Sequence, residues 1–428
     1  MLELLDLRSR RERLEPRRLE IDASVSEAVR GIIQRVRDKG DAALLDLTLR
    51  FDGADMHATG LVVTDAEFQV AQEAIPHELQ RAIDGLVDRI TDLHERQLPR
   101  EWWAERDGVR YGEIVRPIER VGCYVPGGRA LYPSSVAMTV VPAVVAGVEQ
   151  IVVCTPPRKD GTMNAAMLYA AARAGATRVV KVGGAQAIAA MAFGTDSVPP
   201  VDRIVGPGNV YVTEAKRQVA GRVGIDGLAG PTELVIVADA TADPEFLATD
   251  LIAQAEHDPE ASTILVTADP GVADRATVAL EHQLAGAGRR EIVDAALEHA
   301  RIVLVADGEQ AAEVVNDLAP EHLLLLVSEA RALAAKIRNA GGIFVGNFTP
   351  VSFGDYGVAS NHVLPTAGTA RFASGLRAAD FVTVSSVVET SDDAAAALAS
   401  EVATIARAEG LVGHARAAEI RAERKSEG

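Results

Sequence analysis

The chain has 428 residues and a formal net charge of −18, and 48% of its residues are apolar. This length suits two or three domains, and the acidic balance argues against a nucleic-acid-binding protein, which needs a basic surface. Apolar runs stay shorter than the ~18 residues of a membrane span, so no membrane partner is expected. The sequence contains two cysteines, Cys123 and Cys154, a usage that favours a reducing compartment and predicts a cytoplasmic protein.

The N-terminal stretch RSRRERLEPRR is basic, but acidic residues interrupt it and no apolar segment follows. We interpret residues 1–23 as a solvated arm rather than a signal or transit peptide. Residues 24–98 have the apolar spacing of amphipathic helices, and the pattern changes to strand from about residue 109. We therefore expect a helical region over 24–120 that packs on the first α/β domain.

Farther along, short apolar runs rich in β-branched residues alternate with helical segments. The runs are QIVVCT, TRVVKVGG, DRIVG, ELVIVAD, STILVTAD, ARIVLVAD, LLLLVS and GGIFVG. The alternation is typical of βαβ units with parallel sheets. We predict an α/β fold with two doubly wound Rossmann-like domains, a helical N-terminal region and a C-terminal helical tail.

The boundary between the two α/β domains should fall in the Gly-rich segment DGLAGPTE, which separates 121–232 from 233–388. Residues 389–428 should form the tail. Its helices are rich in alanine and only modestly apolar, so they must gain their stability by packing against another surface.

Two stretches carry side chains that could bind a metal ion. In LIAQAEHDPE, Gln254 and His257 are three apart on a predicted helix that should end near Pro259, so they share one face. In FGDYGVASNHVLPT, Asp355 precedes His362 by seven residues. Histidine with nearby oxygen donors can bind a divalent metal, although an aspartate in such a loop commonly serves as a turn or cap.

Two loops have glycines between a strand and a helix. They are VKVGGAQAIAA, with Gln186, and IVGPGNVYV, with Asn209. Each can be a plain turn, but two in succession favour a nucleotide, because glycine lets a phosphate approach the backbone. In the related stretch VGCYVPGGRALYPSS, Tyr124 can lie against a flat ligand or belong to the core.

Glu321 and His322 stand side by side before a run of four leucines. They can be a buried structural ion pair or two bases held at one pocket. In ARAEGLVGHARAAE, Glu409 and His414 flank a helix junction. Capping explains Gly410, and nothing local explains His414.

The order of these motifs resembles histidinol dehydrogenases. The matching segments are GCYVPGG, GGAQAIAA, GPGN, AGPTE, AQAEHD, APEHL, GDYGVASNHVLPTAGTARFASGL and EGLVGH. They cover roughly residues 20 to 420 without a missing block, and the long segment at 354–376 and AQAEHD are the most specific.

The resemblance implies a four-electron oxidation of L-histidinol to L-histidine via histidinaldehyde, the last step of histidine biosynthesis. It also implies NAD as oxidant, one Zn²⁺ per subunit, and a homodimer whose C-terminal tails are swapped to give shared active sites. The implied metal ligands, which would also contact substrate, are Gln254, His257, Asp355 and His414, the last from the partner subunit. The implied catalytic pair is Glu321 and His322, the implied NAD contacts are Tyr124, Gln186 and Asn209, and Thr232, Glu409 and His322 would contact substrate.

The residues suit this chemistry. A histidine has an unperturbed pKa near 6.5, suitable for taking the alcohol proton as hydride leaves, and a carboxylate beside it could activate water for the second oxidation. Two alternatives remain at this stage. One is an aldehyde dehydrogenase that uses Cys123 or Cys154 as a nucleophile, and the other is a two-lobed small-molecule binding protein.

Overall fold

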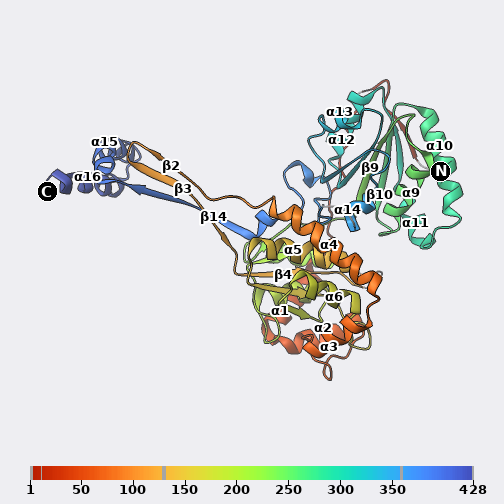
Figure 1. Ribbon diagram of the computed structural model, residues 1–428, viewed down its shortest axis with the longest axis horizontal. Coiled ribbons are helices and arrows are strands. Elements are labelled where there is room, and N and C mark those ends of the chain that lie inside the picture. Colours follow the sequence, from red (N-terminus) through yellow and green to blue (C-terminus); the bar gives the residue numbers. More distant parts are fainter. Residues whose placement is uncertain (1–2, 11, 128–131, 357–359, 427–428) are drawn as a thin grey trace. The chain divides into compact units, whose positions relative to one another are not determined.

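A computed structural model describes residues 3–10, 12–127, 132–356 and 360–426 of the chain (Figure 1). The chain divides into two compact units. The first comprises Met1–Gln97 and Glu119–Phe381, and the second comprises Leu98–Ile118 and Val382–Gly428.

The first unit contains a six-stranded parallel sheet in the order β1-β11-β10-β9-β12-β13. Its strands are β1 (Glu3–Asp6), β9 (Glu233–Ala238), β10 (Ser262–Thr267), β11 (Arg301–Leu304), β12 (His322–Leu326) and β13 (Gly342–Val345). The helices of this region are α9 (Pro244–Ala255), α10 (Pro270–Leu284), α11 (Arg290–Leu297), α12 (Gly308–Leu318), α13 (Ala330–Ala334) and α14 (Val351–Tyr356), with 3₁₀ turns η1 (Thr369–Arg371) and η2 (Ala378–Phe381).

Strand β12 shows how an apolar run forms a strand that is covered on both faces of the sheet. Successive side chains point to opposite faces of a sheet, and helices cover both faces here (Figure 1). Leu324 and Leu326 pack with α9 and α10, whereas Leu323 and Leu325 pack with α12 and α13. A strand buried on both sides must be apolar throughout, so the run of leucines suits β12, which lies inside the sheet between β9 and β13.

The first unit also contains a five-stranded parallel sheet in the order β6-β5-β4-β7-β8. Its strands are β4 (Arg120–Tyr124), β5 (Gln150–Cys154), β6 (Arg178–Val180), β7 (Arg203–Val205) and β8 (Gly224–Ile225). Its helices are α1 (Ala23–Lys39), α2 (Asp41–Asp52), α3 (Asp65–Ala74), α4 (His77–Glu95), α5 (Pro133–Ala146), α6 (Ala165–Ala174), α7 (Gly184–Phe193) and α8 (Val210–Val219). One face packs with α1, α2, α7 and α8, while α5 contacts β4 and β5 and is itself packed against α4 and α6.

The second unit is a three-stranded antiparallel sheet with two helices. The strands, in the order β14-β3-β2, are β2 (Trp102–Arg106), β3 (Val109–Pro117) and β14 (Val382–Thr390). The helices α15 (Asp392–Ala408) and α16 (Val412–Ser426) pack on each other around Ala403, Ala406 and Ala415. That core consists of alanine methyl groups, so the helices bury little apolar surface between themselves.

The predicted fold class is confirmed, because all eight apolar runs form strands of two parallel, doubly wound sheets. Helices occupy the predicted N-terminal region and the tail. Two features were not anticipated: the N-terminal arm begins with strand β1, and β3 pairs with β14 from the far end of the sequence. Among the described residues, no helix combines the length and the apolar character needed to cross a membrane.

Candidate active site

Glu321 and His322 lie where the chain turns from α12 into β12. Helix α12 ends at Leu318, its C-cap residue Ala319 adopts a left-handed conformation with φ of 48°, and Pro320 follows. The turn places the pair at the amino end of the interior strand β12, where Glu321 is 7% exposed and His322 is 5% exposed. A rigid, buried strand start is a precise support for reacting groups.

Three contacts converge on one oxygen of Glu321. The hydroxyl of Thr232 donates to Oε2 at 2.6 Å, and the backbone amide of Glu233 donates to the same oxygen at 2.9 Å. Nδ1 of His322 lies 3.4 Å away. Burial pushes the pKa of Glu321 upward, but the His322 charge and these hydrogen bonds outweigh it and hold the pKa below its usual value. The structure therefore favours a carboxylate at Glu321.

The two ring nitrogens of His322 differ in their hydrogen bonding. Nδ1 lies 3.1 Å from the backbone carbonyl oxygen of Glu233, which can only accept, so Nδ1 carries a hydrogen. Nε2 is buried without a hydrogen-bond partner among the described residues. Burial lowers the pKa of His322, but Glu321 and Asp355 outweigh it and raise the pKa above its usual range. When the ring is neutral, its lone pair is therefore on Nε2.

A second group of polar side chains gathers beside this pair. Gln254 lies at the end of α9 and is buried, and its Nε2 donates to Oγ1 of Thr232 at 2.5 Å. His257 follows the end of α9, and Asp355 lies on α14. Oδ1 of Asp355 is 3.9 Å from Nδ1 of His362. Thus Thr232, Gln254, His257, Glu321, His322 and Asp355 come together in the first unit.

Two further residues of this site, His362 and Glu233, were not among the catalytic, binding or metal-ligating residues implied by the sequence. Nε2 of His362 lies 3.0 Å from the hydroxyl oxygen of Ser135 on α5. Burial and the nearby rings of His322 and His257 lower the pKa of His362. Glu233 is buried beside Glu321, and its Oε1 accepts a hydrogen bond from the backbone amide of Ala367. The proximity of His362 to Asp355 in the sequence was a signal, whereas nothing local distinguished Glu233 from an ordinary strand residue.

A cavity of about 1720 Å³ opens in front of these side chains. On one wall it reaches Thr232, His257, Glu321, His322 and Asp355, at the amino end of the six-stranded sheet. On the other it reaches Pro126 and Gly127 after β4 and residues 206–210 after β7, at the carboxyl end of the five-stranded sheet. Ligands commonly bind at this carboxyl end in α/β domains, and the same cavity extends from it to Glu321 and His322.

The loop after β7 is held by a buried ion pair. Nζ of Lys216 contacts Oδ1 of Asp226 and donates to the carbonyl of Gly206 at 3.1 Å, while Oδ2 of Asp226 accepts from the Gly206 amide at 2.7 Å. Gly206 has φ of 114°, and a Cβ there would lie 2.0 Å from the carbonyl oxygen of Tyr124. Only glycine fits, and both of its backbone polar groups are fixed.

The predicted nucleotide contacts occupy different environments. Asn209 lines the cavity and caps α8, where its side chain accepts from the amides of Tyr211 and Val212. Tyr124 and Gln186 are buried, and the hydroxyl of Tyr124 accepts from the Gly184 amide at 3.1 Å. These two residues therefore lie beneath the GGAQ loop and are not exposed at its surface.

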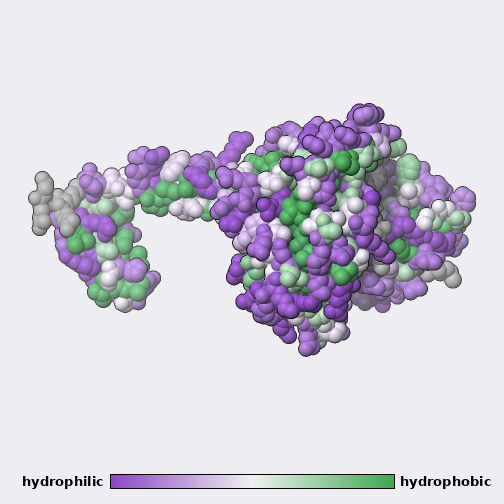
Figure 2. Space-filling view, turned by 90° about the horizontal axis from the view of Figure 1, so that it is seen from below, coloured by the Kyte–Doolittle hydropathy of each residue, from purple (hydrophilic) through white to green (hydrophobic). Residues whose placement is uncertain are grey.

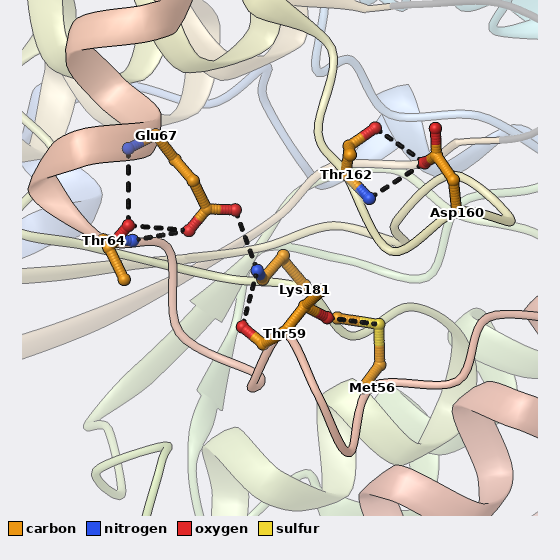
Figure 3. A network of polar contacts seen from close by, with 7 residues as sticks. All are labelled: Met56, Thr59, Thr64, Glu67, Asp160, Thr162 and Lys181. Atoms are coloured by element: carbon orange, nitrogen blue, oxygen red, sulfur yellow. Dashed lines mark hydrogen bonds and ion pairs between the residues drawn. The ribbon is translucent and has the colours of Figure 1, made fainter.

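The strand that leads into the GGAQ loop is anchored by a second buried cation. Lys181, fully buried after β6, donates to Glu67 at 2.9 Å and to the carbonyl of Thr59 at 3.3 Å (Figure 3). Glu67 also closes a capping box with Thr64 at the start of α3. These contacts join the segment before α3 to the strand and fix the base of the loop.

Glu409 and His414 belong to the second unit. Glu409 is the C-terminal cap of α15, and His414 lies in the first turn of α16. Residues 128–131 of the GCYVPGGRALYPSS segment and 357–359 of GDYGVASNHVLPT lie outside the described residues.

The expected zinc ligands can be compared with the donor atoms that zinc usually binds. Within the described part of the chain, no cluster of three or more His, Cys, Asp or Glu side chains is arranged to hold a metal. In the first unit the expected ligands include one imidazole, one carboxylate and one amide, the oxygen and nitrogen donors that zinc accepts. His257 and Asp355 line the same cavity, and Gln254 already uses its NH₂ group on Thr232. These residues fit zinc chemically.

The cysteine alternative conflicts with the structure. Both cysteines are fully buried in β4 and β5. Burial raises the pKa of Cys123 to about 12 and raises that of Cys154 as well. A nucleophilic cysteine needs an accessible thiolate, so neither residue serves this role.

Two Rossmann-like sheets, a glycine loop at a strand end and buried bases facing one cavity define an α/β oxidoreductase. The family model described as histidinol dehydrogenase matches residues 15–422, and the chain belongs to this family. The histidinol dehydrogenase of Geobacillus kaustophilus is 49% identical over 93% of this chain and 94% of its own length. That of Halalkalibacterium halodurans is 48% identical over 92% and 93%. The crystal structure of the Elizabethkingia anophelis enzyme superposes with a TM-score of 0.94 at 34% identity and covers 99% of both chains.

Proposed function

We propose that this chain oxidises L-histidinol to L-histidine through histidinaldehyde, in two NAD-linked steps and with one zinc ion per subunit. One observation carries the proposal. The buried Nε2 of His322 has no hydrogen-bond partner among the described residues and lies beside the carboxylate of Glu321. Both residues line the cavity that reaches the loop after β7. The overall reaction consumes one water and two NAD⁺, and it yields two NADH and three protons.

In the first step His322 would accept the hydroxyl proton of the alcohol at Nε2, and bound NAD⁺ would supply the hydride acceptor. The hydrogen on Nδ1, directed at the Glu233 carbonyl, keeps Nε2 in the accepting state. The charge of Glu321 stabilises the imidazolium that forms. His322 thus gains a proton where a stabilising partner is already in place.

In the second step Glu321 would take a proton from water, which attacks the carbonyl carbon of the aldehyde, while His322 returns to the carbonyl oxygen the proton that it gained in the first step. The resulting diol would release a proton to His322, and a second bound NAD⁺ would supply the hydride acceptor, which leaves the carboxylic acid. The acid then ionises to the carboxylate and releases the third proton. Both groups are held in a dry environment, where charge interactions are stronger than in water. Two adjacent bases therefore match two successive oxidations.

Gln254, His257 and Asp355 would hold the zinc, with His414 of the partner subunit as the fourth ligand. When bound, the ion would supply a Lewis-acidic anchor that orients the imidazole and amine of the substrate. Asn209 and the loop that begins at Gly206 would position NAD, with Tyr124 and Gln186 supporting the separate GGAQ loop at Gly183 and Gly184. Thr232 and Glu409 would contact the substrate.

The shared-site homodimer is supported by the surface of the second unit. It exposes large apolar side chains, visible as green atoms over this unit in Figure 2. Among the exposed apolar residues of this unit are Val388 at 67% and Val412 at 68% exposure. The small alanine core of α15 and α16 leaves these side chains to be covered by another surface. We propose that a second copy of the chain covers this apolar surface. We also propose that the dimer acts in the cytoplasm.

The test is an assay at 340 nm with L-histidinol and NAD, with and without a zinc chelator. We expect two NADH per histidinol, loss of turnover after chelation and recovery with added zinc. His257→Ala should lose metal, whereas Tyr124→Phe should retain it. Absence of NADH formation by the metal-loaded dimer would contradict the proposal, and anomalous scattering without a peak near His257 and Asp355 would contradict the metal site.

A further inference from the structure

Thr232 stands between two residues with different proposed roles. It precedes β9, and its hydroxyl oxygen is 2.6 Å from Oε2 of Glu321 and 2.5 Å from Nε2 of Gln254. Its backbone carbonyl accepts from the amide of Ser262, which joins it to β10 at 3.0 Å. The hydroxyl is therefore placed by two neighbouring strands and has little freedom to move.

The direction of both hydrogen bonds follows from counting hydrogens. Oε2 of Glu321 accepts from the Glu233 amide, and the proposed role of Glu321 as a base requires the ionised carboxylate, so this oxygen carries no hydrogen of its own. A threonine hydroxyl has one hydrogen, and that hydrogen goes to Glu321. The oxygen of Thr232 can then only accept from Gln254. The NH₂ group of Gln254 must face Thr232, and the amide oxygen must point elsewhere.

We propose that Thr232 is a positioning residue that turns the amide oxygen of Gln254 toward the zinc ion and fixes the carboxylate of Glu321 beside His322. The inference rests on the zinc proposed above and adds a relay between the metal ligand and the water-activating base. An amide binds a cation through oxygen, so an unconstrained Gln254 would present the wrong end part of the time. Hydrogen bonds behind a metal ligand commonly change metal affinity by ~10–100-fold.

The matched variants are Thr232→Val and Thr232→Ser. Valine keeps the shape of threonine and removes the hydroxyl, whereas serine keeps the hydroxyl. Thr263→Val is the control for the chemical change, because Thr263 on β10 is 1% exposed and its hydroxyl has no hydrogen-bond partner among the described residues. Removing an unpartnered buried hydroxyl should not weaken metal binding.

The experiment titrates the metal-free dimer with zinc against a chromophoric chelator. We expect Thr232→Val to weaken zinc binding about 10–100-fold, and Thr232→Ser and Thr263→Val to stay within about threefold of wild type. In a Gln254→Leu background, Thr232→Val should cause no further loss, because the relay acts through Gln254. Thermal unfolding of the metal-free proteins separates this pattern from a general loss of stability, and Thr232→Ala replaces valine if that variant does not fold.

Two results overturn the relay and are distinguishable. If wild type binds zinc and Thr232→Val binds it equally tightly, the relay is wrong and the zinc proposal stands. If the wild-type dimer binds no zinc, the zinc proposal fails and the relay falls with it. Additive losses in the double variant would also overturn the relay, because Thr232 would then act independently of Gln254.

Discussion

The backbone amide of Glu233 donates to Oε2 of Glu321 at 2.9 Å, so two carboxyl groups are buried in the same region. Burial and the charge of Glu321 raise the pKa of Glu233 from 4.5 to about 8. Between these pH values the folded protein keeps a proton on Glu233 that the unfolded chain has lost.

Glu233 should therefore make the protein less stable as pH rises from about 4.5 to 8, because the folded state binds more protons than the unfolded state across this window. Glu233→Gln is neutral at every pH and should show a smaller loss of stability. Unfolding midpoints in urea, followed by circular dichroism from pH 5 to 8, measure the difference. Parallel curves for the two proteins would show that Glu233 ionises normally in the fold.

The pKa of His322 predicts where activity appears with pH. The ring must be neutral to accept a proton, and its pKa lies above the usual 6.5 because Glu321 and Asp355 outweigh the effect of burial. The acidic limb of kcat/KM should therefore have its midpoint above pH 6.5. Glu321→Gln removes the main opposing charge and should move the limb to lower pH. An unmoved limb in this variant would mean that another group is titrating.

The proposed roles of the two bases predict a split between half-reactions. His322→Ala should slow both oxidations, because each releases a proton to that ring. Glu321→Ala should slow the aldehyde step by about 10²–10⁴-fold, the usual contribution of a general base, and slow the alcohol step less. Single-turnover measurements with histidinol and with histidinaldehyde compare the two. Equal losses in Glu321→Ala would contradict its role with water.

The fold was predictable wherever local pattern determines structure. Four consecutive leucines after His322 can be buried on alternate sides only in a strand covered on both faces, and β12 has this environment. The pairing of β3 with β14 was not predictable, because it joins residues 109–117 to 382–390. Such pairing depends on the closure of a long loop, and neither segment specifies its partner.

The site was predictable in part for a similar reason. The local sequence was enough to identify Glu321, His322 and the AQAEHD segment as candidate site residues. The role of Glu233 arises only because β9 and β12 are neighbours, with His322 opposite Leu234. The contact of His362 with Ser135 likewise joins residues 227 positions apart. Contacts that form only between tertiary neighbours, such as these two, leave no local signal in the sequence.

Removing the Lys216–Asp226 ion pair should impair only the binding of NAD. Lys216→Met combined with Asp226→Leu removes both charges, so no buried charge is left unpaired and stability should change little. The backbone of Gly206 would lose both side-chain contacts, and KM for NAD should rise several-fold while zinc binding is retained. Asp226→Leu alone should be strongly destabilised by the unpaired lysine. A normal KM for NAD in the double variant would show that the loop does not need the pair.

The position of His414 predicts complementation between two inactive chains. His414 lies on α16 of the second unit, whereas His257, Gln254 and Asp355 lie in the first. If His414 completes the zinc site of the partner subunit, His257→Asn and His414→Asn chains are each inactive as homodimers. In a heterodimer, one site then has both defects and the other has neither.

Mixing the two variants under conditions that allow subunit exchange should therefore restore activity, with a ceiling of about half the wild-type value per heterodimer. Differently tagged chains allow the heterodimer to be purified, and its zinc content should be one ion per dimer. His414→Asn mixed with wild type gives the matched control, since one intact site should remain there as well. If exchange is demonstrated and the mixed variants stay inactive, His414 serves its own chain or is not a ligand.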